Sequence, residues 1–244
     1  NLLVGDRGSR GLVLDTSALA SLDEGAVKGE GILAAEAGLS VDRLCEAARE
    51  RGLAGLETFY GMPGSVGGAA FMNARCYDVE MADRVAWVDI LRPGAQEPER
   101  LPFAPGDWAY KKSPFQPGGR AAGAAILAVA YRLGEGDAEA IGRVMREKRA
   151  DREAKGHYRL PSAGSVFKNN RGFGRPSGKI LDELGLRGKR IGGAMVSEWH
   201  ANIFVNAGGA TASDMRSLIE LAESEARQRF GYELEPEVLM VGDF

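Results

Sequence analysis

The sequence predicts an α+β fold in at least two lobes. Segments with apolar residues at helical spacing are interleaved with short β-branched or apolar runs, and the two kinds do not follow a strict βαβ rhythm. A highly charged helical segment separates the two halves of the chain. The chain has 244 residues, 44% of them hydrophobic, which is enough to bury the core of one large domain or two small ones.

The N-terminal half is predicted to contain four strands and one helix. Asn1 to Val4 and Gly11 to Asp15 flank a Gly/Asp turn and indicate two short strands. A helix is expected to begin with Ser40 as its N-cap, because apolar residues follow at helical spacing. Arg84 to Leu91 and Ala124 to Leu133 are bounded by Gly and Pro and indicate two more strands, with a polar loop between them.

The C-terminal half is predicted to be mixed. Ala138 to Lys155 carries a narrow apolar stripe among many charges, which is typical of a solvated helix that bridges two domains. Ser177 to Leu184 is expected to be helical and Ala194 to Asn206 to be a strand. A long helix is expected to start near Ser213, and Glu237 to Val241 is expected to form the last strand.

Charge and cysteine content exclude several classes of protein. The net charge is −3 and no basic block is present, so nucleic acid is not an expected partner. Cys45 and Cys76 are too few for a disulfide framework, and we expect both to be thiols in a reducing cytoplasm. No apolar run is long enough to span a bilayer. The chain opens on a predicted strand without Met, so residues are expected to be missing before Asn1.

The densest glycine cluster lies in the segment from Gly61 to Ala69. It contains Gly61, Gly64, Gly67 and Gly68 together with Pro63 and Ser65. Such a segment lets the backbone approach a ligand and point N–H groups at oxygens, as flavin and phosphate loops require. A tight structural turn is about equally compatible with this composition. The segment is neither a Rossmann fingerprint nor a Walker loop.

A serine in a segment of small residues is the main candidate for proton transfer. Pro161 to Asn169 presents Ser165 after Gly164, with Lys168 following closely. An ordinary serine is a poor acid at neutral pH, so proton donation requires a nearby cation or a strongly basic carbanion. An N-cap or turn serine is the more frequent alternative. No nucleophile elbow is present, which disfavours serine-hydrolase chemistry.

Three further segments are uninformative when taken singly. Tyr110 to Phe115 and Leu234 to Val238 are each compatible with a solvated surface turn. His200, which precedes an apolar strand, is compatible with a core histidine that bonds the backbone.

Taken together, these segments resemble one family. The Gly55-Leu56-Glu57 tripeptide leads into the glycine-rich segment, and the order of motifs along the whole chain is similar to that of UDP-N-acetylenolpyruvoylglucosamine reductases. The later segments that carry the resemblance are Asn73, Tyr110 to Ser113, Ser162 to Asn169, Ile191 to Ala194, His200 to Asn202 and Leu234 to Val238. The absence of a long insert between Ser165 and Asn206 resembles the shorter subclass, which lacks a tyrosine-bearing loop.

The resemblance implies a fold and a division into domains. It implies a two-lobed FAD-binding domain of the vanillyl-alcohol-oxidase type in residues 1–134, to which the C-terminal strand 237–244 returns. It also implies a linker helix and an α+β substrate-binding domain in residues 135–236. The implied protein is a cytoplasmic monomer that binds no nucleic acid, no membrane and no metal.

The resemblance implies an enzyme with FAD and NADPH as cofactors. NADPH reduces the flavin, and the flavin then delivers a hydride to the enolpyruvyl group of a UDP-sugar to form UDP-N-acetylmuramate for peptidoglycan. The implied catalytic residues are Ser165 as proton donor, Glu237 and Lys111. Implied substrate contacts are Tyr110, Lys155, Lys168, Asn169 and His200, and implied cofactor contacts are Asn1, Gly61, Pro63, Gly64, Ser65, Gly67, Gly68 and Asn73.

Three departures from the family pattern leave alternatives open. Lys111 and Leu239 stand where the family usually has arginine, so bidentate contacts to a carboxylate are lost. The family's first flavin subdomain, with its glycine-rich loop, would precede Asn1. Another FAD oxidoreductase of the same superfamily, or a truncated fragment that binds a UDP-sugar without flavin, therefore remains an alternative.

Overall fold

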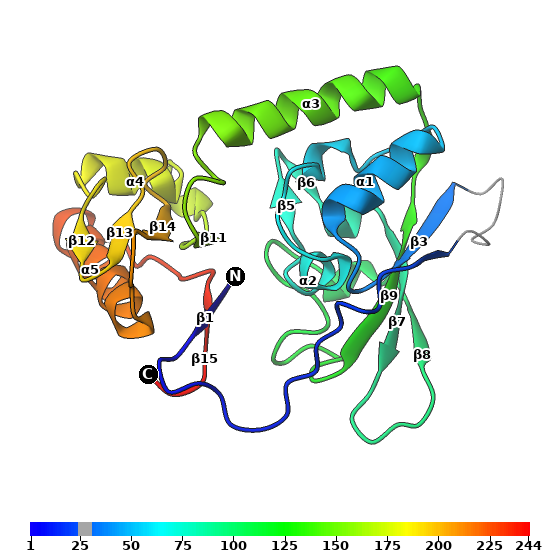
Figure 1. Ribbon diagram of the computed structural model, residues 1–244, viewed down its shortest axis with the longest axis horizontal. Coiled ribbons are helices and arrows are strands. Elements are labelled where there is room, and N and C mark those ends of the chain that lie inside the picture. Colours follow the sequence, from blue (N-terminus) through cyan, green and yellow to red (C-terminus); the bar gives the residue numbers. More distant parts are fainter. Residues whose placement is uncertain (24–30) are drawn as a thin grey trace. The chain divides into compact units, whose positions relative to one another are not determined.

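A computed structural model describes residues 1–23 and 31–244. The chain divides into two compact units: unit 1 comprises Asn1–Val13 and Asp151–Phe244, and unit 2 comprises Leu14–Ala150 (Figure 1). The long helix α3 (Ala138–Ala154), predicted from its sequence, contains the boundary between residues 150 and 151. The boundaries of these compact units differ from those of the functional domains expected from the sequence. The extent of the functional domains stays a prediction.

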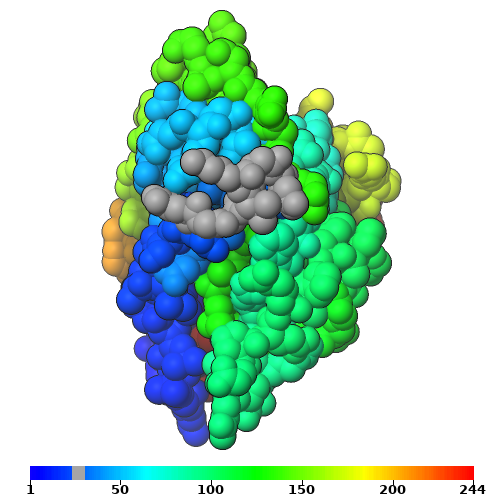
Figure 2. Space-filling view, turned by 90° about the vertical axis from the view of Figure 1, so that its right-hand side faces the viewer, coloured from blue at the N-terminus to red at the C-terminus, as the bar shows by residue number. Residues whose placement is uncertain are grey.

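Unit 2 is built on a five-stranded antiparallel sheet. In spatial order its strands are β2 (Leu22–Asp23), β3 (Ile32–Glu36), β9 (Ala125–Arg132), β7 (Val85–Leu91) and β8 (Glu99–Pro102). Helices α1 (Val41–Glu50) and α2 (Val66–Phe71) share one apolar core with the sheet. The space-filling view faces this unit and shows α1 in light blue and the β7–β8 region in green at its surface (Figure 2).

The shorter elements of unit 2 lie in the connections. Strands β4 (Leu53–Ala54) and β10 (Gly134–Glu135) pair with each other, and β5 (Arg75–Cys76) forms a hairpin with β6 (Val79–Glu80). Three 3₁₀ turns complete the unit: η1 (Glu57–Phe59), η2 (Met81–Asp83) and η3 (Pro105–Asp107).

Unit 1 combines a four-stranded antiparallel sheet with two helices. In spatial order the strands are β11 (Ser162–Ser165), β14 (Ile203–Asn206), β13 (Ala194–Val196) and β12 (Arg190–Ile191). The 3₁₀ turn η4 (Arg171–Phe173) and helix α4 (Ser177–Glu183) follow β11, and α5 (Ala212–Phe230) follows β14. Leu218 and Ile219 of α5 pack with Ile180 and Leu181 of α4 in one buried cluster.

The N-terminal residues belong to unit 1 because two interactions hold them there. Strand β1 (Leu2–Val4) pairs in parallel with β15 (Leu239–Val241), near the other end of the chain. The Asp6 carboxylate accepts hydrogen bonds from the backbone N–H groups of Ala212 and Ser213, at 2.6 and 3.0 Å, where α5 begins. A carboxylate at this position satisfies helix N–H groups that have no partner within the helix.

Most of the predicted elements are confirmed, with two corrections. The helix after Ser40, the strands at 85–91 and 125–132, and the three later helices are present. Gly11 to Asp15 is not a strand: its residues are exposed and pair with no strand among the described residues. Ala194 to Asn206 is not one strand but the antiparallel pair β13 and β14, joined by a turn from 197 to 202. Within the described residues no helix has the length and apolar character needed to cross a membrane.

Candidate functional site

Three residues predicted from the sequence line one cleft in unit 1. Ser165, Asn169 and His200 lie around a cavity of about 250 Å³ between the start of α4, the end of β11 and the β13–β14 turn. The other charged residues of this cleft were not predicted from the sequence; they are Lys179, Asp182 and Arg187. Lys179 and Asp182 lie on α4, and Arg187 follows this helix. The spacing of these three residues in the sequence forms no recognised motif.

The local backbone sets the position of Ser165. Pairing between β11 and β14 shifts register between Ser162 and Ser165, and Gly164 has a φ of +80°. An irregularity of this kind redirects the side chain that follows it, and a positive φ is readily adopted by glycine. Within the part of the chain that the structure describes, the half-buried Ser165 hydroxyl makes no hydrogen bond. This hydroxyl is therefore available to a bound molecule.

Asn202 fixes the segment that follows Ser165. Its side-chain amide donates to the Phe167 carbonyl at 2.8 Å, and its side-chain oxygen accepts from the Phe167 N–H at 3.0 Å. The backbone carbonyl of Asn202 also accepts from Val166 N–H at 2.8 Å. These buried bonds hold the peptide next to Ser165 in one conformation.

Glu237 lies on the segment paired with the residues after Ser165. The Glu237 N–H donates to the Val166 carbonyl at 2.7 Å, and Glu237 is only 6% exposed. The Asn1 side-chain amide donates to Glu237 Oε1 at 3.2 Å, and Leu239 N–H donates to the Asn1 carbonyl at 2.8 Å. The two predicted catalytic residues of unit 1, Ser165 and Glu237, thus lie on adjacent backbone segments, and Asn1 contacts Glu237.

The predicted anion-binding residues of unit 1 have their own polar partners. Lys155 Nζ lies 2.6 Å from Asp151 Oδ2, and Lys168 Nζ lies 2.6 Å from Glu235 Oε1. The Asn169 side-chain oxygen accepts from the Ser177 N–H at 2.9 Å, at the start of α4.

His200 is held in its neutral form. Burial, followed by the positive charges of Lys155 and Arg187, lowers the pKa of His200, and the Asp182 carboxylate opposes this shift. Its Nδ1 accepts a hydrogen bond from the Asn202 N–H at 3.3 Å, which leaves Nε2 as the donor of a neutral ring. Asp182 is itself engaged in a bidentate ion pair with Arg187.

In unit 2 the glycine-rich segment is fixed to α1 and to Ala37, the residue after β3. The Asp42 carboxylate accepts from Gly61 N–H at 2.6 Å, and Ser65 caps α2 by accepting from Gly68 N–H at 3.2 Å. Gly67 packs so closely that an added Cβ would lie 2.8 Å from the Ala37 Cβ. Gly61, Ser65 and Gly67 therefore have structural roles in this segment.

The remaining predicted residues of this segment face solvent. Pro63, Gly64 and Gly68 are exposed. A Cβ added at Gly64, where φ is +130°, would meet no atom of the described residues within 4 Å. Exposed glycine backbone on a fixed frame fits the close approach of a flavin cofactor. Gly61, Ser65 and Gly67 hold the backbone of the segment in place. Contact with the flavin would therefore fall to Pro63, Gly64 and Gly68.

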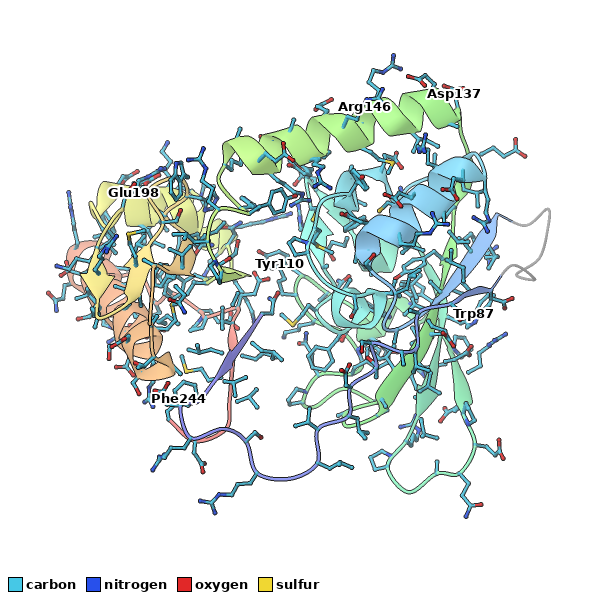
Figure 3. The ribbon with its side chains drawn as sticks, in the orientation of Figure 1. Trp87, Tyr110, Asp137, Arg146, Glu198 and Phe244 are labelled. Atoms are coloured by element: carbon cyan, nitrogen blue, oxygen red, sulfur yellow. The ribbon has the colours of Figure 1, made fainter. Side chains whose placement is uncertain are left out.

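Tyr110 and Lys111 form the tip of a tight turn in unit 2. Ala109 and Lys112 close the turn with two backbone hydrogen bonds, at 2.9 and 3.3 Å, and Lys111 has a φ of +56°. The Arg75 guanidinium lies 5.6 Å from the centre of the Tyr110 ring, which is labelled in Figure 3. Both predicted residues are thus presented together by one turn.

Asn73 has an internal role that its sequence motif does not indicate. It is fully buried, and its side-chain amide donates to Glu80 Oε2 and to the Ala109 carbonyl, both at 2.8 Å. Its side-chain oxygen accepts from Ala82 N–H at 3.0 Å. Both N–H donors of the side chain are therefore used within unit 2, and contact with a cofactor would fall to the backbone of Asn73 or to the second lone pair of its oxygen.

Comparison with known protein families gives two matches. Residues 156–241 match the model described as UDP-N-acetylenolpyruvoylglucosamine reductase, C-terminal domain, and residues 1–96 match the model described as FAD binding domain.

Individual relatives and a solved structure give the same result. The UDP-N-acetylenolpyruvoylglucosamine reductase of Treponema denticola is 41% identical over 252 aligned positions, which cover 100% of this chain and 78% of that protein. The reductase of Rubrobacter xylanophilus is 43% identical over 246 positions with the same coverage. The crystal structure of the enzyme from Thermus caldophilus is similar with a TM-score of 0.71 and 32% identity, covering 88% of this chain and 74% of that one. The chain belongs to the family of UDP-N-acetylenolpyruvoylglucosamine reductases.

Proposed function

We propose that the chain catalyses the NADPH-dependent reduction of UDP-N-acetylglucosamine enolpyruvate to UDP-N-acetylmuramate, a precursor of peptidoglycan. The names of the relatives and the match to an FAD-binding domain support this function. The protein is an FAD-dependent oxidoreductase. When bound, FAD would accept a hydride from NADPH and supply a hydride to the terminal carbon of the enolpyruvyl group.

One observation supports the assignment of the chemistry most directly. Ser165 and Glu237 come from adjacent backbone segments although 72 residues separate them in the chain, and the Ser165 hydroxyl has no internal partner within the described residues. Hydride addition to the terminal carbon leaves an enolate beside the substrate carboxylate. The Ser165 hydroxyl would donate its proton to the carbon next to that carboxylate, because an enolate is basic enough to accept a proton from an ordinary alcohol.

The substrate carboxylate and the negative charge that develops on the enolate beside it require polar neighbours. We assign Lys111 to the substrate carboxylate and Glu237 to orienting the enol form, with Asn1 holding the Glu237 carboxylate through its 3.2 Å hydrogen bond. An electrostatic contact of this kind is worth about 3 kcal/mol in a transition state. Lys111 offers a single point of charge where a planar guanidinium would form two parallel bonds.

The remaining substrate contacts concern the UDP-sugar. We assign Lys155 and Asn169 to the diphosphate, with Lys168, Tyr110 and His200 as further substrate contacts. Because Lys155 is ion-paired with Asp151, diphosphate binding would exchange one carboxylate partner for a phosphate. A neutral His200 would act as a hydrogen-bond donor through Nε2.

The cellular setting follows from the proposed reaction. We propose a cytoplasmic monomer, and the two free buried cysteines are compatible with a reducing compartment. Sedimentation of the purified protein measures the oligomeric state, and a dimer at micromolar concentration would refute the monomer.

The test of the chemistry separates the two half-reactions by rapid mixing without oxygen. Ser165→Ala is expected to leave flavin reduction by NADPH within about twofold of wild type and to slow flavin reoxidation by the enolpyruvyl substrate by about 10²- to 10⁴-fold. Ser162→Ala is the matched control, since Ser162 lies on the same strand with its hydroxyl facing the Gly164 N–H. Equal rates for Ser165→Ala and the control would refute the role of Ser165.

A further inference from the structure

Backbone strain in unit 2 is concentrated around the turn that carries Tyr110 and Lys111. Among the described residues, the non-glycine residues with positive φ are Asn73, Tyr77, Asp78 and Lys111, with φ between +40° and +73°. All four lie in the β5–β6 hairpin, at its start, or in the Ala109–Lys112 turn. Such residues persist only where their surroundings hold them, and they cluster at functional sites.

Asn73 connects these two strained turns. One N–H of its side chain binds Glu80, the last residue of the hairpin, and the other binds the carbonyl of Ala109, which opens the second turn. Because Asn73 is fully buried and both bonds use its one amide group, the separation between the two turns is fixed. Loss of either bond would leave a polar group without a partner.

Arg75 provides a second connection between the same turns. Its guanidinium forms ion pairs with Asp78 at 2.7 Å and Glu80 at 3.2 Å, and it lies within cation–ring distance of Tyr110. The two carboxylates restrict the guanidinium to one orientation. The aromatic ring of Tyr110 thus rests on a cation that the hairpin holds in place.

We propose that Asn73 and Arg75 are positioning residues that hold the Tyr110–Lys111 turn in its substrate-binding conformation. This inference rests on the proposed roles of Tyr110 and Lys111. It adds a role for Asn73 and Arg75, which contact the turn and not the substrate. It also explains how Lys111 is maintained at a φ that a lysine rarely adopts.

The test uses Arg75→Gln with a matched arginine as control. Arg100 also forms a bidentate ion pair, with Asp89, and lies 4.6 Å from the centre of the Trp87 ring on another part of the sheet. The KM for the enolpyruvyl substrate is expected to rise about fivefold in Arg75→Gln, in the range expected for loss of one cation–ring contact. Flavin reduction at saturating NADPH is expected to stay within about twofold, and Arg100→Gln is expected to match wild type in both measurements.

Rescue and a second variant keep the test decisive. Arg75→Lys retains the charge and is expected to recover the substrate KM to within about twofold of wild type. Asn73→Asp places a carboxylate against Glu80 and is expected to raise the substrate KM more than Arg75→Gln does. If Arg75→Gln does not fold, Glu80→Gln replaces it, because that change removes one of the two charges that hold Arg75 and keeps an acceptor for Asn73.

The outcomes separate this inference from the proposed function. Wild-type protein that does not turn over the enolpyruvyl substrate would refute the proposed function itself. Wild-type turnover with an unchanged substrate KM in folded Arg75→Gln would overturn only the positioning role. Suppose that in Arg75→Gln the substrate KM rises and flavin reduction slows by the same factor, and that the melting temperature falls. This result would identify a general structural role for Arg75 and would also overturn the positioning role.

Discussion

The strongest structural prediction concerns Asn202 and the segment that carries Ser165. Asn202→Asp keeps the size of the side chain and the oxygen that accepts from Phe167 N–H, but it replaces the amide donor by an oxygen facing the Phe167 carbonyl, 2.8 Å away. Loss of the donor leaves the buried Phe167 carbonyl without a partner, which costs about 1–3 kcal/mol. The free energy of unfolding is therefore expected to fall by about 1–3 kcal/mol.

The assay is equilibrium unfolding in urea at neutral pH, with Asn170→Asp as control. Asn170 is exposed and uses only its side-chain oxygen, which accepts from Gly172 N–H at 2.8 Å, so the same substitution there is expected to change stability by less than about 0.5 kcal/mol. Equal stabilities for the two variants would refute the argument that Asn202 holds the peptide next to Ser165.

Three further predictions address other parts of the molecule. Tyr131 is fully buried, and its hydroxyl has no partner among the described residues. Tyr131→Phe is therefore expected to raise the free energy of unfolding by about 1 kcal/mol. A lower melting temperature for this variant would contradict the prediction. Burial lowers the pKa of His157 to about 4, below its unfolded value of 6.5. The stability that neutral His157 contributes is therefore fully present above pH 6.5 and is lost as the pH falls towards 4. The free energy of unfolding of His157→Gln, measured across this range, is expected to depend less on pH than that of wild type. Gly67→Ala is expected to destabilise the protein by about 1–3 kcal/mol, because the added Cβ meets Ala37. Gly68→Ala is expected to fold normally, since its added Cβ meets only the Ser65 hydroxyl, at 3.4 Å. Equal melting temperatures for the two variants would contradict this difference.

Local patterns were sufficient for the longer elements of the fold. Helix α1 has its N-cap serine, its apolar stripe and Gly52 beyond its end within one stretch of sequence, and the strands β7 and β9 are apolar runs between turn residues. The hairpin of β13 and β14 was missed, because its turn contains Ala201 and Asn202, which are buried like the residues of the strands. The turn is set by contacts with Val166 and Phe167, which no local pattern contains.

The candidate site depends on contacts between distant parts of the chain. The Asn1 side chain meets Glu237 across 236 residues, and Asp182, Arg187 and His200 come together from α4, the loop after it and the β13–β14 turn. The resemblance to a family selected Ser165, Asn169 and His200, and the structure brings these three to one cleft. Their chemical roles stay predictions, as do those assigned to the residues of unit 2.

The sequence motif around Asn73 illustrates the limit of motif reading. The family resemblance implied a cofactor contact for Asn73, which stays a prediction, and the structure commits the amide donors of its side chain to Glu80 and Ala109. Burial and hydrogen-bond partners, which a sequence does not contain, distinguish a residue that binds a ligand from one that holds the residues that do.

The visible spectrum of the purified 244-residue protein, recorded without oxygen, tests the proposed function most directly. We expect bound flavin whose absorbance is lost on addition of NADPH and recovers on addition of UDP-N-acetylglucosamine enolpyruvate, with UDP-N-acetylmuramate as the product. A folded protein that takes up no FAD, or whose reduced flavin is not reoxidised by that substrate, would contradict the proposed function.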